Sequence, residues 1–347
     1  MRQQGPVGVA TQGSACGDTR TRAEARNASG GQLGRTGRRK FYRRAGNREQ
    51  CGQTSHTALS AAYSPMTLRF SKMHGIGNDF VVIDGRNGHA LPQTATIRAI
   101  ADRRTGVGFD QLLSVEPARD PSCAFYYGIW NADGSPAGQC GNGVRCVAAW
   151  LHRAGAIAIG DTVRLESPSG PVTIRMLAAD RVAVDMGEPE FAPVRIPFEV
   201  AEQAARYALI VDDETLEIGA VSMGNPHAVV EVSELQSPTL EYLGPQITAH
   251  PRFATSVNAG FVQKLDRDHL RLRVHERGAG WTLACGTGAC AAMAVLRQRD
   301  EVNERVQVTL PGGTLQIDWV GPGHSLWMTG PAAFAFEGEW PDSMSAD

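Results

Sequence analysis

The sequence lacks long hydrophobic runs: no apolar stretch approaches the roughly 18 residues that a membrane-spanning helix needs, so we expect no membrane contact. It also lacks the closely paired cysteines of a zinc ribbon or a secreted disulfide framework, because its seven cysteines are scattered along the chain. We therefore expect free thiols in a reducing cytoplasm. The 347 residues, 42% hydrophobic and 20% charged, are typical of a globular chain that buries a sizeable core without metals or disulfides.

Charge of one sign is not in excess overall, but it is unevenly divided along the chain. The formal net charge is −2; residues 1–65 hold 11 Lys and Arg against 3 Asp and Glu, net +8, and the body holds 23 against 33, net −10. An acidic body argues against a nucleic-acid partner.

Residues 1–65 show neither helical nor strand periodicity and are rich in Gly, Arg, Thr, Ser and Gln. Such a segment cannot bury enough apolar surface to fold alone, so we expect a disordered extension. We favour Met66 as the true start of translation. A transit peptide is the alternative, although no amphipathic Arg-rich helix supports it.

The body from Met66 onward repeats itself, with two cysteines that lie 145 positions apart. Cys-Gly-X-Gly at 140–143 and at 285–288 precedes an apolar segment that predicts a helix opening at the glycines. Polar landmarks before each cysteine and a strand–turn–strand pair after it recur in the same order and at nearly the same spacing. The matched positions are Asn78 and Asn225, Gln111 and Asn258, Asn131 and Glu276, and Pro168 and Pro311.

A duplicated unit of this kind predicts an α+β fold with two pseudo-symmetric domains, each a mostly antiparallel or mixed sheet wrapped around a central helix. The expected domains are residues 66–185 plus 330–341, and residues 186–329. Approximate two-fold symmetry brings both helix N-termini to the cleft between the domains, where we expect the active site.

The two cysteines suit acid/base chemistry at a carbon atom. Unpaired N–H groups at a helix N-terminus favour a bound carboxylate, and the same field lowers the pKa of a thiol placed there. One cysteine would then be the base and the other the acid, on opposite faces of an α-carbon, and the order of the two roles stays open. The reaction is racemisation or epimerisation, and it requires no pyridoxal-type cofactor.

From Met66 to about Trp340 the chain resembles the diaminopimelate epimerase family, pyridoxal-independent isomerases of lysine and peptidoglycan biosynthesis. The motifs that carry the resemblance are FSKMHGIGNDFVVIDG, GFDQLL, NADGSPAGQCGNGVRC, VSMGNPH, VNAGF and ERGAGWTLACGTGACA. It implies a homodimer that converts LL-2,6-diaminopimelate to the meso form without a cofactor or a metal. One departure is Trp281, where many relatives have Glu.

The resemblance also implies a role for each site residue. Cys140 and Cys285 form the acid/base pair. The amides of Gly141, Asn142, Gly286 and Thr287 bind the α-carboxylate, and Glu276 binds the α-ammonium group. The distal end is held by Asn131, Asn225, Asn258 and Arg277, with Asn78 and Gln111 completing the pocket.

Other interpretations follow from the same residues. GTGACA matches the loose Gly-X-Gly-X-X-Ala dinucleotide fingerprint of NAD-dependent oxidoreductases, but a strand–turn–strand pair follows it instead of a βαβ crossover. A proline racemase-like isomerase and a non-catalytic amino-acid-binding protein remain as alternatives. A redox disulfide or a metal site is disfavoured by the absence of Cys-X-X-Cys and of nearby His ligands.

Five further positions have plain structural interpretations. Cys123, Cys146 and Cys290 lie among apolar neighbours, which is typical of buried structural thiols. His227, beside a Gly-Asn turn, is interpreted as a packed or hydrogen-bonded side chain. Arg103 is interpreted as part of a solvated helix end, with a place near an anionic substrate as the alternative.

Overall fold

The computed structural model describes residues 67–88 and 90–341, which belong to one compact unit. The expectations of a disordered extension and of a start at Met66 lie outside these residues. No helix in the described part of the chain is long and apolar enough to cross a membrane.

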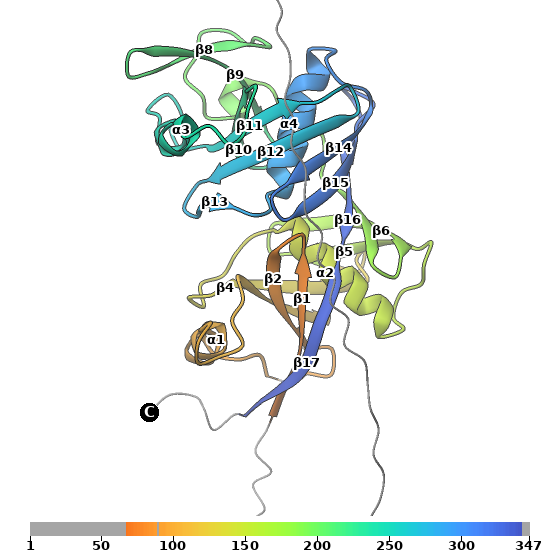
Figure 1. The fold of residues 1–347 in the computed structure, drawn as a ribbon. Coiled ribbons are helices and arrows are strands. Elements are labelled where there is room, and N and C mark those ends of the chain that lie inside the picture. The colour runs from red at the N-terminus through yellow and green to blue at the C-terminus, as the bar shows by residue number, and fades with distance from the viewer. Residues whose placement is uncertain (1–66, 89, 342–347) are drawn as a thin grey trace, which may run out of the picture. The chain divides into compact units, whose positions relative to one another are not determined.

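The first half of the repeat contains seven strands and two helices (Figure 1). They are β1 (Thr67–Gly75), β2 (Asn78–Asp84), α1 (Thr94–Ala101), β3 (Gln111–Pro117), β4 (Phe125–Asn131), α2 (Gly141–Arg153), β5 (Thr162–Ser167), β6 (Gly170–Ala178) and β7 (Arg181–Asp185). From β1 to β7, consecutive strands pair antiparallel, parallel, antiparallel, parallel, antiparallel and antiparallel.

The second half begins after a short 3-10 helix, η1 (Pro193–Arg195). Its elements are β8 (Tyr207–Val211), β9 (Glu214–Ser222), β10 (Pro226–Glu231), α3 (Thr239–Thr248), β11 (Asn258–Lys264), β12 (His269–Glu276), β13 (Gly280–Thr282), α4 (Gly286–Gln298), β14 (Arg305–Leu310), β15 (Gly313–Asp318) and β16 (Trp327–Pro331). With β13 set aside, the pairing from β9 to β16 repeats the same series of antiparallel and parallel partners.

The last strand, β17 (Ala333–Pro341), returns to the first half and pairs antiparallel with β1, as Figure 1 shows. It occupies the place beside β1 that β8 occupies beside β9. β16 also pairs with β7, so hydrogen bonds join the two halves in one sheet of the described residues. The domain boundaries expected from the sequence stay a prediction.

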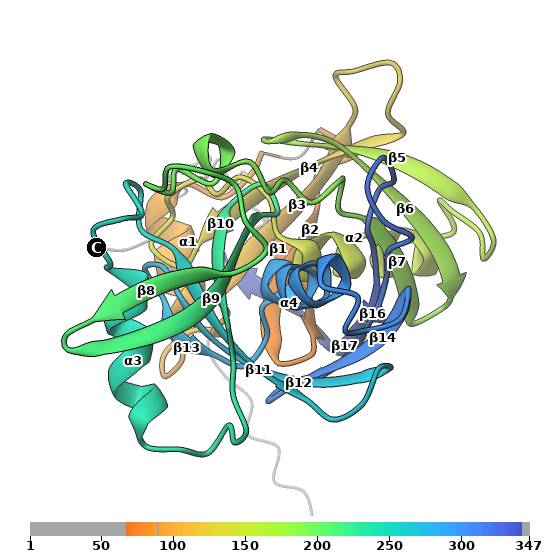
Figure 2. The same cartoon turned by 90° about the horizontal axis from the view of Figure 1, so that it is seen from above.

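Helices α2 and α4 occupy the centres of the two halves. Each helix begins directly after its cysteine and is 13 residues long. In α4 the side chains are mostly small or aliphatic, and they are buried on nearly every side of the helix. α2 packs on β1, β2, β3, β6 and β7, and α4 on β9 to β12, β14 and β15. The two helices also contact each other, and Figure 2 shows them side by side. The α+β fold with a helix inside each mixed sheet is therefore confirmed.

The turn between β14 and β15 packs against the turn between β1 and β2, and glycine permits this contact. A Cβ atom on Gly312 would lie 1.9 Å from the carbonyl oxygen of Ile76 and 3.0 Å from that of Leu283. No side chain fits at that distance, so Gly312 is required for the two halves to meet here.

Candidate active site

A cavity of about 1670 Å³ lies where the two halves of the repeat meet. The sequence-predicted site residues line it, with the exception of Asn258. They are Asn78, Gln111, Asn131, Cys140, Gly141, Asn142, Asn225, Glu276, Arg277, Cys285, Gly286 and Thr287. The fold thus brings residues from both halves to one concave site.

Cys140 and Cys285 are the N-cap residues of α2 and α4, as the sequence predicts. Both have extended backbone angles, φ −137° and ψ 112° for Cys140 and φ −125° and ψ 102° for Cys285. This geometry leaves the amides of the first helical turn without intrahelical partners, so they are available to an anion. Cys140 is partly buried and Cys285 is 3% exposed.

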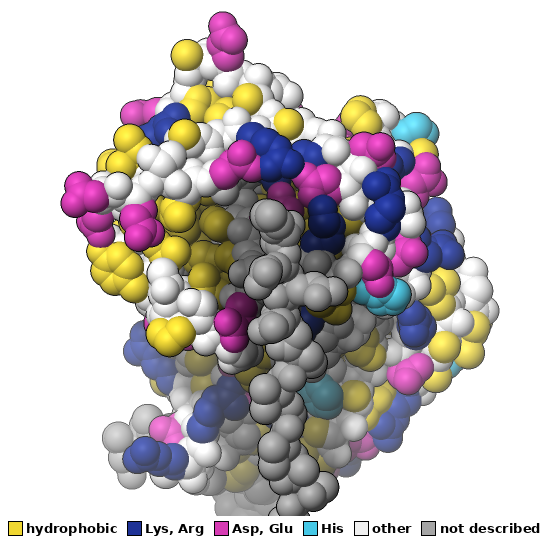
Figure 3. All heavy atoms as spheres, turned by 45° about the horizontal axis from the view of Figure 1, so that its top comes forward, with side chains coloured by type: hydrophobic (Ala, Val, Ile, Leu, Met, Phe, Trp, Pro, Cys, Tyr) yellow, Lys and Arg dark blue, Asp and Glu magenta, His cyan; other side chains and the backbone are white. Residues whose placement is uncertain are grey.

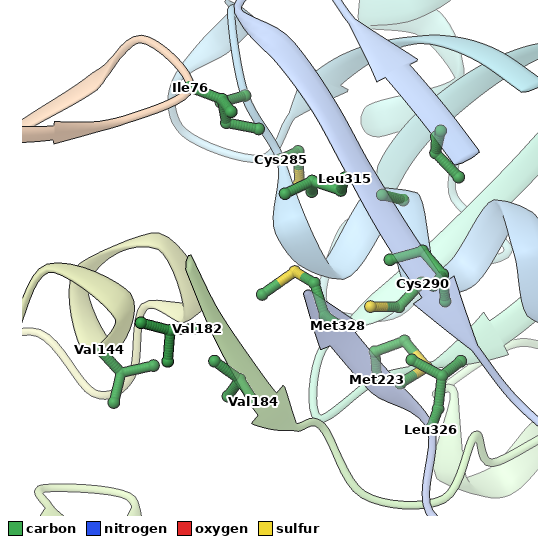
Figure 4. Close-up of a cluster of buried hydrophobic side chains, with 14 of the residues drawn as sticks. Ile76, Val144, Val182, Val184, Met223, Cys285, Cys290, Leu315, Leu326 and Met328 are labelled. Carbon is green, nitrogen blue, oxygen red and sulfur yellow. The ribbon is translucent and has the colours of Figure 1, made fainter. Parts of the chain in front are cut away.

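A single methionine of β16 packs under both helix N-termini. A Cβ atom on Gly141 would lie 2.8 Å from Cε of Met328, and one on Gly286 would lie 2.9 Å from its Sδ. Figure 4 shows Met328 between Val184 of β7 and Cys285. The glycine that follows each cysteine therefore leaves room for the Met328 side chain to pack against the helix N-terminus. Sequence reasoning did not find this reason for glycine at the two positions.

The protonation of both thiols is governed by burial. Burial raises the pKa of Cys140, against the effect of the N–H groups of Gly143 and Asn142, which lower it. Burial also raises the pKa of Cys285 well above its usual value, and the Glu276 carboxylate raises it further. Desolvation of the charged form is thus the larger effect on both thiols, and the helix N–H groups oppose it; the expectation of one thiolate stays a prediction.

The polar residues of the first half form a connected set around Cys140. The Cys140 thiol lies 3.6 Å from Oδ1 of Asn78, which also accepts a hydrogen bond of 3.4 Å from Nδ2 of Asn142. Gln111 and Asn131 are cross-strand partners on β3 and β4, and Nε2 of Gln111 donates to Oδ1 of Asn131 at 3.2 Å. Their amides therefore lie next to each other at one end of the cavity.

The second half has an equivalent set around Cys285. Nδ2 of Asn225 donates to the Thr287 hydroxyl at 3.4 Å, and that hydroxyl lies 3.7 Å from the Cys285 sulfur. His227 contacts Oδ1 of Asn225 at 3.1 Å, and burial lowers the pKa of His227 to about 3, so the ring is neutral. His227 is thus the packed, hydrogen-bonded histidine that the sequence predicts.

Glu276 is the last residue of β12, Arg277 follows it directly, and both line the cavity. The Glu276 carboxylate accepts a hydrogen bond from Thr282 and raises the pKa of both cysteines. Arg277 donates from Nη1 to the carbonyl of Thr255 at 2.8 Å, and its backbone N–H donates to Oδ1 of Asn258 at 2.9 Å. Asn258 is buried behind the cavity wall, where it holds the backbone of Arg277.

A group of charged residues lies at the first-half end of the cavity, and sequence reasoning considered only Arg103 among them. Arg103 forms ion pairs with Asp79 at 2.8 Å and with Asp110 at 2.7 Å, and Lys72 pairs with Asp79 at 2.6 Å. All four residues line the cavity, so the structure places Arg103 at the cavity, as the alternative interpretation expected, while its side chain just beyond the end of α1 is still 58% exposed. The two carboxylates could have been found in the sequence, because each stands next to a polar residue that recurs in the repeat: Asp79 follows Asn78, and Asp110 precedes Gln111.

The remaining described cysteines are structural. Cys123, Cys146 and Cys290 are free and buried, and burial raises the pKa of Cys146 to about 12.

Arg145 of α2 lies between the helices without solvent exposure. Its guanidinium group donates hydrogen bonds to the carbonyl of Gly141 at 3.2 Å and to that of Pro331 at 3.1 Å.

The outer surface has a different character from the cavity. On the face shown in Figure 3, acidic and basic side chains are interspersed. The described residues form surface ion pairs such as Arg206 with Glu301, at 2.6 Å. Such pairs contribute little to stability individually.

Solved structures with the same fold include epimerases, an isomerase and phenazine biosynthesis proteins. A hydroxyproline epimerase from Agrobacterium vitis superposes with a TM-score of 0.57 at 18% identity, covering 79% of this chain and 92% of that one. A methylitaconate-delta-isomerase superposes with a TM-score of 0.60 at 12% identity, covering 81% and 97%. The chain therefore shares the fold of these solved structures.

The family within this fold is given by sequence. The diaminopimelate epimerase family model matches residues 70–192 and 219–335. Curated diaminopimelate epimerases from Xanthomonas axonopodis pv. citri and Pseudomonas savastanoi pv. phaseolicola are 53% and 48% identical over 274 and 276 residues. Each alignment covers 79% of this chain, and it covers 96% and 99% of the two relatives. The chain belongs to the diaminopimelate epimerase family and is an isomerase that acts on an amino acid.

Proposed function

We propose that the protein interconverts LL-2,6-diaminopimelate and meso-diaminopimelate with Cys140 and Cys285 as its two acid/base groups. The observation that carries this proposal is the placement of two N-cap cysteines, one from each half of the repeat, in one cavity. Such a reaction supplies an intermediate of lysine and peptidoglycan biosynthesis.

In the proposed reaction, the thiolate of one cysteine removes the α-proton from one face of the substrate carbon. The thiol of the other cysteine delivers its own proton to the opposite face, so the configuration inverts and the two sulfur atoms exchange protonation states. The reverse reaction uses the same pair with exchanged roles. No step needs an electron acceptor or a bound cofactor.

The helix N-termini supply the anion site. The amides of Gly141 and Asn142 in α2, and of Gly286 and Thr287 in α4, follow the two cysteines directly. A substrate α-carboxylate bound to them gains negative charge as the carbanion forms, and donors that are already oriented stabilise this charge without reorganisation.

Glu276 couples substrate binding to the activation of the thiols. Its carboxylate raises the pKa of Cys140 and of Cys285. A substrate α-ammonium group paired with Glu276 offsets this negative charge near the sulfur atoms, so a thiolate forms more readily. The base is thus generated when the substrate is present.

The distal end of a doubly charged substrate suits the remaining polar residues. Arg277 presents a planar guanidinium that can bind a carboxylate through two parallel hydrogen bonds. Gln111, Asn131 and Asn225 line the same cavity with amide groups that can donate to the carboxylate and accept from the ammonium group. We propose the same residues as the determinants that separate this substrate from proline.

The proposal is tested by incubation with LL-diaminopimelate in deuterium oxide, followed by chiral analysis and mass spectrometry. We expect meso product that carries one solvent deuterium at the inverted centre. A protein that only binds amino acids would leave the substrate unlabelled, and a proline racemase-like isomerase would label proline instead. The homodimer implied by the family resemblance stays a prediction, which light scattering of the purified protein checks.

A further inference from the structure

The two amides that face the cysteines are held differently in the two halves. Asn78 and Asn225 occupy equivalent positions in the repeat. Asn78 contacts the Cys140 thiol, and Asn225 contacts the Thr287 hydroxyl, which lies beside the Cys285 sulfur. Gln111 and Asn258 are also equivalent positions in the repeat. The residue before Gln111 is Asp110, whereas the residue before Asn258 is the buried Val257. Only the amide of the first half therefore has a carboxylate beside it at this position.

Asp110 determines which way the Asn78 amide points. Oδ2 of Asp110 accepts hydrogen bonds from Nδ2 of Asn78 at 2.7 Å and from the backbone N–H of Asp79 at 3.1 Å. Its other oxygen accepts from Arg103 at 2.7 Å. Because an ionised carboxylate can only accept, Asn78 must turn its NH2 group to Asp110 and its oxygen to Cys140.

The oxygen of Asn78 then faces two donors, the Cys140 thiol at 3.6 Å and Nδ2 of Asn142 at 3.4 Å. In the second half, Asn225 contacts His227 and Thr287 instead. His227 also lies 3.5 Å from Nδ2 of Asn258. A neutral imidazole and a hydroxyl can each donate or accept, so no ionised group fixes the orientation of the Asn225 amide.

We propose that Asp110 is a positioning residue, which holds the oxygen of Asn78 toward Cys140 and so keeps the proton on Cys140 in the free enzyme. The proposal rests on the two-cysteine reaction proposed above and concerns the protonation of one member of the pair. A carbonyl oxygen accepts a hydrogen bond from a thiol but repels a thiolate, so this contact favours the protonated form of Cys140.

Other charged and titratable groups also act on Cys140. Arg145 of α2 lowers its pKa and Glu276 of β12 raises it. The remaining groups are Cys146 of α2, Tyr127 of β4, Cys285 across the cavity, and the set of Lys72, Asp79 and Arg103 that lies behind Asn78. Because these groups stay in place, the effect of Asp110 is measured as the change that follows its replacement.

The test is the pH dependence of Cys140 alkylation by iodoacetamide, followed in the full chain by peptide-resolved mass spectrometry. In Asp110→Leu the Asn78 amide is free to turn its NH2 group to the sulfur. We therefore expect the midpoint of the Cys140 alkylation curve to fall by about one pH unit, which corresponds to about tenfold faster alkylation at neutral pH. Asp110→Asn removes the charge but keeps an oxygen for the N–H groups of Asn78 and Asp79, so its midpoint should stay near that of the wild type. The midpoint of Cys285 in the same digests is the internal control.

Two results overturn the proposal: an unchanged midpoint in Asp110→Leu, or an equal shift in Asp110→Asn, which would mean that charge and not orientation matters. If Asp110→Leu does not fold, Asn78→Ala carries the test. It must lower the midpoint of Cys140 by a similar amount, and adding Asp110→Asn must shift it no further. Alkylation needs no turnover, so a failure of the proposed epimerisation is seen separately, as absent inversion of LL-diaminopimelate by the wild type.

Discussion

Replacing Gly286 with alanine tests the packing of Met328 beneath the helix N-termini. The new Cβ atom would lie 2.9 Å from Sδ and 3.3 Å from Cε of Met328, where ordinary contacts are about 3.5–4.0 Å. The Met328 side chain, which is fully buried, or the N-terminus of α4 must therefore move by roughly 0.5 Å or more.

The expected cost follows from two opposing effects. Overpacking a dense core costs about 1–3 kcal/mol. The higher helix propensity of alanine recovers at most about 1 kcal/mol, and less at the first helical position. We expect a net loss of about 1–2 kcal/mol in the free energy of unfolding, a fall in Tm of about 2–8 °C. A shift of the Gly286 and Thr287 amides away from the substrate carboxylate should lower kcat/KM about tenfold.

Thermal and urea denaturation together with steady-state kinetics measure these effects. Gly260→Ala is the matched control, because a Cβ atom there would lie 3.6 Å from Leu272, an ordinary contact. Met328→Leu shortens the reach of the side chain, so the double variant with Gly286→Ala should be more stable than the sum of the single effects by about 1 kcal/mol. Equal stabilities of the Gly286 and Gly260 variants, with no coupling to Met328, would refute the reasoning.

Further predictions concern the reaction itself. Cys140→Ser and Cys285→Ser should each lower epimerisation at least about 100-fold in both directions, because a hydroxyl of much higher pKa is a poor base. Rapid deuterium labelling of recovered substrate by the wild type would instead indicate a single base. Arg277→Lys should raise KM more than it lowers kcat, because a point charge replaces a two-donor fork; the opposite pattern would place Arg277 at the reacting carbon. For the wild type, kcat/KM should still be rising as the pH passes about 8.5, the ordinary pKa of a thiol, because burial raises the pKa of both thiols and the base must be a thiolate; a profile that levels off below that pH would contradict this. Glu276→Gln should move that rise to lower pH while it weakens substrate binding, and an unmoved profile would show that Glu276 does not act on the thiols.

The sequence alone was sufficient for the repeat and for most of the candidate site. Cys-Gly-X-Gly before an apolar segment is a local signal, and it correctly predicted that α2 begins at Gly141 and α4 at Gly286. Matched spacing around the two cysteines then indicated which polar residues are equivalent, and the family resemblance implied that they form the pocket; all of them except Asn258 line the cavity. This inference works because two copies of one fold place equivalent positions at equivalent points in space.

Contacts between distant segments could not be predicted in this way. Residues 330–341 were expected in the first half, but local periodicity did not give their partner strand or its register, which places Arg69 opposite Glu339 in the pairing of β1 with β17. The network that links Arg103 to Asp110 depends likewise on how α1 ends beside β3. Hydrogen-bond pairing over such separations depends on the whole fold, because the same strand pattern fits several partners.

The protonation of the two thiols shows most clearly what the sequence determined and what only the tertiary structure decided. The residues themselves determined that each cysteine stands at a helix N-terminus, where the field of the helix favours a thiolate. Only the tertiary structure decided that the two halves close around both sulfur atoms, with Cys285 almost fully buried and Glu276 near both. Loss of water is the larger effect on a buried charge, and the amount of water that remains is a property of the packed molecule.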